Sequence, residues 1–588
     1  MRAAGAVARG APIAAAARRL GVDAGTLTTR DGAVIAADGQ SLTYVDLAAD
    51  AAAAPLPKAP ALKPREAWRL LGKPLPRLDL AAKSTGTALY AGDIRRPGMR
   101  FATARRIPVL AGRMTGYDAS AAEKMPGVEQ IIPLPDGVAV VARTTWHAFE
   151  AARAVTLTWE AGAAPQDSDA IRQEISASFT PERLDATPRD EGDIDAQTGE
   201  AFTAEYHLPF LAHATMEPMQ AAAELRDGKL TLWVGSQAPG LAQSYAAKAV
   251  GLPTEAVTLH CLPMGGGFGR RAEVDASVLA ALVAQALAPS PVLVTWSREE
   301  DMTHDMYRPM TEGRVRAWLR DGRIAALDLQ TAAPSIIESL AGRADLPLMG
   351  PDSTLAQGAW DQPYAIEHYR VRAYRAPASV PLGFWRSVGA STNGFIHDCA
   401  MDELAHLAGI DPLRFRLDHI SDAASRAVLE AVAEMADWQR PRPGRALGVA
   451  FCQSFGVPTA EVVEVAQTEA GIRITGAWAA VDPGLALNPD TIRAQVSGAM
   501  VFGLSAAVRG EIAFAGGSAV QENFWDYEPL RMDQIPDIQV RILEGGGPIR
   551  GIGEPGTPPA APALANALFA LTGRRARELP LSKSFDFA

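Results

Sequence analysis

The hydrophobic and polar positions near the N-terminus predict a helix, hairpins and an extended connector. Alanines and other apolar residues occupy the first 20 positions at helical spacing, which predicts a helix ending near residue 20. Short alternating runs follow, separated by Asp31-Gly32 and Asp38-Gly39, and such pairs are typical of two-residue hairpin turns. Residues 51–76 are rich in Pro and Lys and have weak periodicity, so they predict an extended segment.

The rest of the chain alternates between strand and helix patterns. After this first region, at 1–80, short apolar runs and one helical pattern from 81 to 160 predict a small α+β domain. Residues 161–200 are polar and contain prolines, so we expect a linker there. Strand and helix patterns intermingle from 201 to 440 and again from 441 to 588, which predicts two larger domains. The predicted fold class is α+β or mixed α/β, with several domains.

Composition supports several domains and narrows the function. The chain has 588 residues, of which 48% are hydrophobic, and a single hydrophobic core stops growing near ~250–300 residues. The net charge is −11 and Lys and Arg form no long block, which argues against a nucleic-acid partner. Because the sequence has no run of about 18 apolar residues, we predict no transmembrane segment.

The cysteines limit the kind of redox chemistry. Cys261, Cys399 and Cys452 are far apart and too few for an iron–sulfur cluster, which needs four ligands. Any redox reaction therefore requires a cofactor that needs no protein sulfur. Near the N-terminus, arginines interrupt the apolar stretch that a secretory signal needs. We expect a cytoplasmic location for the chain as it stands, or a periplasmic one if an export signal precedes it.

The densest chemical motif is the glycine loop at 264–271, with the sequence MGGGFGRR. It lies directly after a predicted strand and before a predicted helix at 274–287. Its glycines let the backbone approach a ligand closely, and free N–H groups at a helix N-terminus suit a phosphate or a metal oxo group. The motif lacks the spacing and the lysine of a P-loop. A tight structural turn explains this motif, taken alone, about equally well.

A second motif, GIGEPG at 551–556, formally satisfies the G-x-G-x-x-G pattern of dinucleotide-binding folds. Pro558 and Pro559 remove two N–H donors, however, and Glu554 would place negative charge beside a pyrophosphate. A nicotinamide-dependent dehydrogenase is therefore the weaker interpretation. The stiff flanking residues instead indicate Glu554 as a general base. For this motif taken alone, a glutamate in a surface turn is the alternative.

Together these motifs resemble segments of molybdenum hydroxylase large subunits, the xanthine dehydrogenase family. Arg270-Arg271 and the loop RSVGAS favour the branch of the isoquinoline 1-oxidoreductase beta subunits. The resemblance implies a hammerhead-like α+β domain at 81–160 and molybdopterin-binding domains at 201–440 and 441–588. The segments that carry it are HATMEP (213–218), GSQAPG (235–240), MGGGFGRR (264–271), GFWRSVGAS (383–391), LNPDTIRAQVSGAMVFGLS (487–505) and GIGEPGTPPAAPALANA (551–567).

The resemblance implies one catalytic base and five cofactor-binding residues. Glu554 matches the glutamate that takes a proton from the attacking oxygen. His213 and Glu217 lie in a family segment, but a structural role is about as compatible with their positions. The cofactor-binding positions are Gln237, Gly267, Phe268, Gly269 and Arg386.

The same resemblance implies a cofactor, a reaction and partners. Family members bind molybdopterin, expected here in its cytosine dinucleotide form, and the pterin dithiolene holds molybdenum in place of protein ligands. The implied reaction hydroxylates an aldehyde or an N-heterocyclic carbon with oxygen derived from water. Electrons would leave through a small [2Fe-2S] ferredoxin-like subunit, with a cytochrome c or a quinone as a further acceptor.

Two features depart from the family pattern. The 588 residues contain no Met-Gly-Gln-Gly loop of the kind that binds the cofactor's dinucleotide part, so residues 1–80 resemble a remnant of the N-terminal cofactor-binding region. The RSVGAS loop also lacks the cysteine of carbon monoxide dehydrogenases, which disfavours that activity. The alternative function is a catalytically silent scaffold, or a truncated subunit that binds the partner but no molybdenum.

Overall fold

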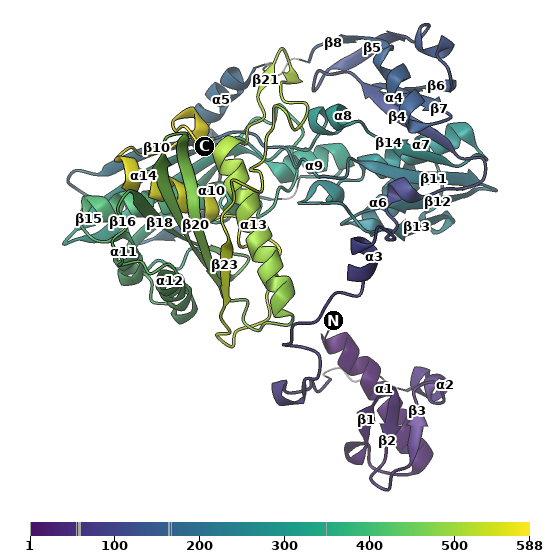
Figure 1. Ribbon diagram of the computed structural model, residues 1–588, viewed down its shortest axis with the longest axis horizontal. Helices are drawn as coiled ribbons and strands as arrows, with labels where there is room; N and C mark the ends of the chain where they lie inside the picture. The colour runs from purple at the N-terminus through teal and green to yellow at the C-terminus, as the bar shows by residue number, and fades with distance from the viewer. Residues whose placement is uncertain (1, 55, 57–59, 163–164, 166, 349) are drawn as a thin grey trace. The chain divides into compact units, whose positions relative to one another are not determined.

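The computed structural model describes the chain except for residues 1, 55, 57–59, 163–164, 166 and 349. It contains two units, Met1–Leu75 and Pro76–Ala588 (Figure 1). Helices and several sheets occur in both the N-terminal and C-terminal halves of the second unit, so the predicted mixed α/β fold with several domains is confirmed.

The first unit is a helix packed on an antiparallel sheet of order β1-β2-β3. Asp31 and Gly32 have φ values of 51° and 81°, the left-handed conformation that the predicted two-residue turn requires. The predicted helix and hairpin are confirmed, while parts of the predicted connector, at 55 and 57–59, lie outside the described residues. The elements are α1 (Arg2–Leu20), β1 (Thr28–Arg30), β2 (Ala33–Ile35), β3 (Ser41–Thr43) and α2 (Ala48–Ala52).

A seven-stranded sheet of order β13-β12-β11-β14-β4-β7-β6 forms one part of the second unit. Strand β4 pairs in parallel with β14, so strands expected in a separate domain at 81–160 share a sheet with the region after residue 200. The boundary predicted between them is wrong because this pairing joins distant strands. The elements are α3 (Leu80–Ser84), β4 (Arg100–Arg106), β5 (Arg113–Asp118), β6 (Val128–Leu134), β7 (Gly137–Ala142), α4 (Thr145–Arg153), β8 (Thr156–Glu160), β11 (Gln220–Arg226), β12 (Lys229–Val234), α6 (Pro239–Ala249), β13 (Val257–Cys261), α7 (Asp275–Leu287), β14 (Val292–Thr295) and α8 (Arg298–Thr303).

A five-stranded sheet has the order β10-β15-β16-β17-β9. Its edge strand β9 and helix α5 both fall within 161–200, so the prediction of a linker there is wrong for the described residues. The strand was missed because most of its side chains are exposed or only partly buried, which makes it polar in sequence. The elements are α5 (Ser168–Ser176), β9 (Leu184–Glu191), β10 (Phe202–Leu208), β15 (Thr311–Arg320), β16 (Arg323–Pro334), α9 (Ile336–Ala344) and β17 (His368–Ala376).

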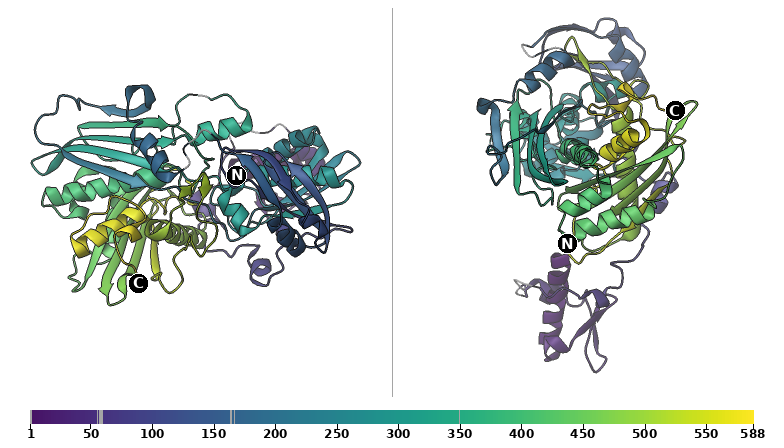
Figure 2. Two further views of the ribbon diagram at one scale, coloured as in Figure 1. Left: turned by 90° about the horizontal axis from the view of Figure 1, so that it is seen from above. Right: turned by 90° about the vertical axis from the view of Figure 1, so that its left-hand side faces the viewer.

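A four-stranded sheet of order β18-β19-β20-β23 completes the unit, with α14 lying against it (Figures 1 and 2). A Cβ at Gly448 of β18 would lie 2.1 Å from the Ala567 nitrogen, so glycine lets this helix pack directly on the strand. Helix α10 contacts both this sheet and the five-stranded sheet, and one hydrophobic core joins the two. The elements are α10 (Ala390–Leu407), α11 (Pro412–His419), α12 (Ala423–Met435), β18 (Arg445–Ser454), β19 (Val457–Thr468), β20 (Gly471–Val481), α13 (Pro489–Arg509), β21 (Phe514–Ala515), β22 (Ser518–Ala519), β23 (Ile538–Ile542) and α14 (Ala560–Thr572).

Helix α13 is long and apolar enough to cross a membrane, and our sequence prediction did not single it out. Of its most apolar window, 44% is buried inside the protein, and the helix packs against α14 and β23. Length and composition alone do not distinguish a core helix from a membrane helix. In this fold α13 occupies the place of a core helix.

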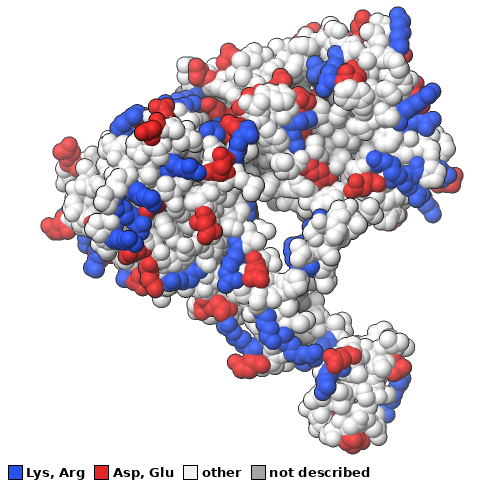
Figure 3. Space-filling model, in the orientation of Figure 1, with Lys and Arg blue, Asp and Glu red and all other residues white. Residues whose placement is uncertain are grey.

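Charged side chains are interspersed over the face of the molecule drawn in Figure 3. Blue and red residues alternate there without a large area of one sign. A nucleic-acid-binding face would carry a continuous basic area, and the drawn face shows none.

Candidate active site

A cavity of about 1070 Å³ lies in the second unit where several loops meet helix α13. Small-molecule sites span ~300–1,000 Å³, so the cavity has room for more than one ligand group. The structure places all six residues singled out in the sequence on its wall, although their roles stay predictions. They are Gln237, Gly267, Phe268, Gly269, Arg386 and Glu554.

The glycine loop follows β13 and turns sharply at the cavity wall. Phe268 and Gly269 have φ values of 55° and 109°, in the left-handed half of conformational space that favours glycine. A Cβ at Gly269 would lie 1.4 Å from the Phe384 carbonyl oxygen, so only glycine fits there. The Gly269 N–H donates to Gln237 Oε1 at 3.1 Å, which leaves Gln237 Nε2 as a donor at the wall.

The glycine loop does not lie directly at a helix N-terminus, as the sequence had suggested. A 3₁₀ turn, Arg270–Ala272, separates it from α7. The turn forms because both of its arginines point into the protein and make buried ion pairs. The N-terminus of α7 therefore does not directly adjoin the glycine loop.

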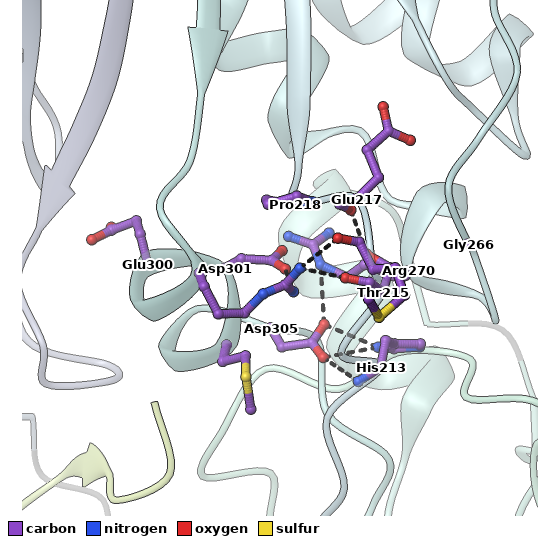
Figure 4. A network of polar contacts seen from close by, with 12 residues as sticks. His213, Thr215, Glu217, Pro218, Gly266, Arg270, Glu300, Asp301 and Asp305 are labelled. Carbon is purple, nitrogen blue, oxygen red and sulfur yellow. Dashed lines mark hydrogen bonds and ion pairs between the residues drawn. The ribbon is translucent and has the colours of Figure 1, made fainter. Parts of the chain in front are cut away.

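Two buried arginines hold the loop, and Figure 4 labels one of them, Arg270. Arg270 is 1% exposed, donates to both carboxylate oxygens of Asp275 at 3.0 and 2.7 Å, and lies 3.0 Å from Asp305. Burial works to raise the pKa of Asp275, but the Arg270 guanidinium outweighs it and the pKa lies below its usual value. Arg271 donates to the Gly266 carbonyl at 2.8 Å and pairs with Glu217 at 3.0 Å. The loop is thus clamped by charge-assisted hydrogen bonds.

His213 and Glu217 both form hydrogen bonds in this network. The His213 ring nitrogens lie 2.9 Å from Asp305 and 3.1 Å from the Phe384 carbonyl, so both are occupied. Glu217 accepts the Gly265 N–H at 2.6 Å through Oε2 and the Gln220 amide at 2.7 Å through Oε1. Of the two alternatives left open by the sequence, the contacts favour the structural one.

Glu554 is half-buried at the cavity wall, in a bend where Gly551 and Gly553 are exposed. The Ser387 N–H donates to Glu554 Oε1 at 3.1 Å, and the Ser387 hydroxyl donates to the Glu554 carbonyl at 2.7 Å. Glu554 Oε2 has no hydrogen-bond partner among the described residues. Ser387 therefore fixes one carboxylate oxygen of Glu554 and leaves the other without a hydrogen bond from the described residues.

Arg386 holds the same loop from the other side. It is buried and donates through Nε to the Gly553 carbonyl at 2.8 Å and through Nη2 to the Gln495 carbonyl at 3.2 Å. Burial lowers the pKa of Arg386 to about 10, partly offset by the Glu554 carboxylate. Its position places a positive charge beside the predicted base.

A stack of three aromatic rings lines the cavity, and sequence reasoning assigned no role to two of its members. Phe502 of α13 lies between Phe268 and Trp385, with ring centroids 4.4 and 4.7 Å apart. Phe502 and Trp385 lie in two of the segments that carry the family resemblance. Their apolar character gave no reason to distinguish them from core residues, so only the structure identifies them as cavity residues.

The cavity wall offers hydrogen-bond donors and one partly free carboxylate. Within the described ranges, no three His, Cys, Asp or Glu side chains are placed to hold a metal ion. A metal at this site would need ligands brought by a cofactor. The Gln237 amide and the close-packed loop backbone suit the polar edge of such a cofactor, and Glu554 suits proton transfer.

Sequence comparisons identify two matching domain models and several relatives. A model described as molybdopterin cofactor-binding domain matches residues 179–419, and a second with the same description matches 402–536. The isoquinoline 1-oxidoreductase beta subunit of Brevundimonas diminuta is 33% identical and aligns with 99% of this chain and 81% of its own length. A nicotinate dehydrogenase subunit of Pseudomonas putida is 30% identical, and the chain spans only 52% of it.

Solved structures share the fold. Quinoline 2-oxidoreductase from Pseudomonas putida 86 matches with a TM-score of 0.73 at 15% identity, over 87% of this chain and 97% of that one. The aldehyde oxidoreductase of Desulfovibrio gigas matches with a TM-score of 0.72 at 16% identity, over 91% and 83%. At such identities the likeness concerns the fold alone.

Proposed function

Because the chain belongs to the xanthine dehydrogenase family as a molybdopterin-binding large subunit, we propose that it hydroxylates an aldehyde or an N-heterocyclic carbon with oxygen from water. One observation carries the proposal: Glu554, Gln237 and the glycine loop, far apart in sequence, line one cavity. Relatives named for isoquinoline and nicotinate support a heterocyclic substrate and leave its charge open.

Some residues of the cavity would bind the cofactor, and another would transfer a proton. Bound molybdopterin would supply the two-electron chemistry that side chains cannot provide. Gln237 Nε2 and the loop backbone would hold it, with Arg386 beside them. Glu554 Oε2, whose partner oxygen is fixed by Ser387, would accept a proton from water-derived oxygen, a contribution of ~10²–10⁴-fold.

The finer features of the cofactor and partners also belong to this proposal. We infer the cytosine dinucleotide form of molybdopterin from the branch that the chain resembles. A small [2Fe-2S] subunit would carry electrons away, since the three cysteines of this chain are too few to hold a cluster. A cytochrome c or quinone would follow it, and the cytoplasm is the proposed location, or the periplasm if an export signal precedes the chain.

The test is to purify the chain with its co-expressed partners, measure molybdenum, and supply isoquinoline or an aromatic aldehyde in ¹⁸O-labelled water with an artificial electron acceptor. The proposal predicts about one molybdenum per chain and ¹⁸O in the product. A molybdenum-loaded complex whose product contains no water-derived oxygen would contradict it. A stable complex without molybdenum would favour the silent scaffold.

A further inference from the structure

We propose that Arg298 limits the size of the molecules that enter the active-site cavity, by holding together two chain segments at its entrance. The segments are 213–218 and 522–530, which are far apart in sequence. The inference rests on the proposed function, because it concerns how a substrate reaches the cavity. It identifies a positioning residue that the proposed function does not use.

Both segments line the cavity and also reach the protein surface. Met216 lines the cavity and is 77% exposed, so it lies where the cavity opens. Phe524 lines the cavity as well, and its neighbour Trp525 is 73% exposed. The entrance to the cavity is therefore bordered by residues of both segments.

The guanidinium of Arg298, the first residue of α8, contacts both segments. Its Nη2 donates to the Thr215 carbonyl at 2.5 Å and to the Met216 carbonyl at 3.1 Å. Its Cζ lies 4.8 Å from the centre of the Phe524 ring, within the range of a cation–π contact. One planar group thus links the backbone of the first segment to an aromatic ring of the second.

The guanidinium is itself held in place by a buried carboxylate. Arg298 Nη1 donates to Asp301 Oδ2 at 2.6 Å, and the two side chains are 11% and 4% exposed. Asp301 and Thr215, two of the partners of Arg298, are labelled in Figure 4. Charge-assisted hydrogen bonds with so little exposure are stronger than those of a surface ion pair. Arg298 can therefore resist a separation of the two segments.

A second contact joins the same part of the chain deeper in the protein. The Tyr527 hydroxyl, in the second segment, donates to the carbonyl of buried Ala212 at 3.2 Å. Ala212 directly precedes the first segment. This contact does not involve Arg298, so the loss of Arg298 should loosen the entrance and leave the inner wall of the cavity in place.

A looser entrance should matter most for a wide molecule. When binding requires the protein to open, the association rate falls, and a wider ligand needs a larger opening. Loss of Arg298 should therefore speed the entry of bulky compounds more than that of small ones. A general loss of stability would instead affect both kinds of compound alike.

The experiment compares benzaldehyde with the bulkier 4-tert-butylbenzaldehyde on the molybdenum-loaded complex with its partners. Stopped-flow fluorescence measures the association rate constant of each compound, and turnover is measured separately. In Arg298→Met we expect the rate constant to rise at least about fivefold for the bulky compound and to stay within about twofold for benzaldehyde. Equal changes for both compounds, no change, slower entry of the bulky compound, or no binding of either compound would overturn the inference. If the bulky compound enters faster but neither aldehyde is oxidised, the proposed function fails and the inference stands.

Two further variants separate the entrance from the stability of the fold. Arg298→Lys keeps the charge beside Asp301 but lacks the planar group that reaches both segments, so the bulky compound should again enter faster. This variant decides the question if Arg298→Met does not fold. Glu299→Gln is the matched control on the same helix, because Gln keeps an oxygen that can accept the Asn523 amide, bound at 2.7 Å. Both rate constants should stay within about twofold in this control, and a rise equal to that of the Arg298 variants would overturn the inference.

Discussion

Two glycine-containing loops line the same cavity, and they are supported in different ways. The glycine loop at 264–271 is backed by buried charges, with Arg270 bound to Asp275 and Asp305. The loop at 551–556 is held mainly by hydrogen bonds from residues 386 and 387, and helix α10 lies close to the residues that follow it. A Cβ at Gly394 of that helix would lie 3.1 Å from Pro558. The first loop is fixed for shape, whereas the second presents a group that can react.

Gly269→Ala should have the largest effect on stability. The new Cβ would lie 1.4 Å from the Phe384 carbonyl in a backbone with φ of 109°, so the loop must move. We expect a loss of more than ~4 kcal/mol or failure to fold, with molybdenum lost from any folded protein. Melting temperature and metal analysis measure this. Gly551→Ala is the control in the other loop, because no atom lies within 4 Å of its Cβ; similar losses in both variants would break the contrast.

Arg270→Met should come next, since it leaves two carboxylates without their buried partner. Removing one member of a buried ion pair costs ~3–5 kcal/mol. The exposed pair Arg493–Asp490, at 2.9 Å, provides the matched control, and Arg493→Met should cost under ~1 kcal/mol. Chemical denaturation of both variants measures the loss in the free energy of unfolding that each substitution causes. A small effect at Arg270 would show that charge does not fix the glycine loop.

A buried histidine of α10, His397, predicts a smaller, pH-dependent effect. Burial lowers the pKa of His397 in α10 to about 3, and its Nε2 lies 2.8 Å from the Tyr369 hydroxyl, which donates to the Ala359 carbonyl. Below pH ~6.5, His397 binds a proton in the unfolded chain but not in the folded chain. Its contribution to stability, fully present above pH ~6.5, is therefore lost as the pH falls toward 3. His397 should lower the free energy of unfolding by up to ~1.4 kcal/mol for each pH unit in this range.

His397→Gln keeps a hydrogen-bonding side chain without this titration. The free energy of unfolding, measured at pH 7, 6 and 5, should therefore decrease less steeply with falling pH in the variant than in the unchanged protein. Parallel pH dependences for the variant and the unchanged protein would show that His397 becomes charged inside the fold.

Strong local patterns could be predicted from the sequence, and distant pairings could not. The N-terminal helix and the turn at Asp31-Gly32 follow from periodicity and from the φ values that glycine permits. Strand β9 was missed because an exposed edge strand has the polarity of a loop. The pairing of β4 with β14 left no local signal, so a domain boundary was placed through a continuous sheet.

In the candidate site, too, local motifs could be predicted from the sequence, and contacts between distant residues could not. Glu554 and the glycine loop were found because their motifs, taken together with the other segments, resemble a known family; taken alone, each motif had a structural explanation. Phe502 and Trp385 were not found, because a cavity aromatic and a core aromatic look alike in sequence. The buried partners of Arg270 also required the fold, since Asp305 lies far along the chain.

The central claim, that Glu554 is the proton acceptor of this cavity, is tested most directly by turnover of Glu554→Gln in the molybdenum-loaded complex with its partners. Gln keeps the size and the contact with Ser387 but cannot take the proton, so turnover should fall ~10⁴-fold or more with molybdenum content and substrate affinity little changed. Glu528→Gln changes the other carboxylate on the wall and should retain most activity. A fully loaded Glu554→Gln complex that turns over at the unmodified rate would contradict the account.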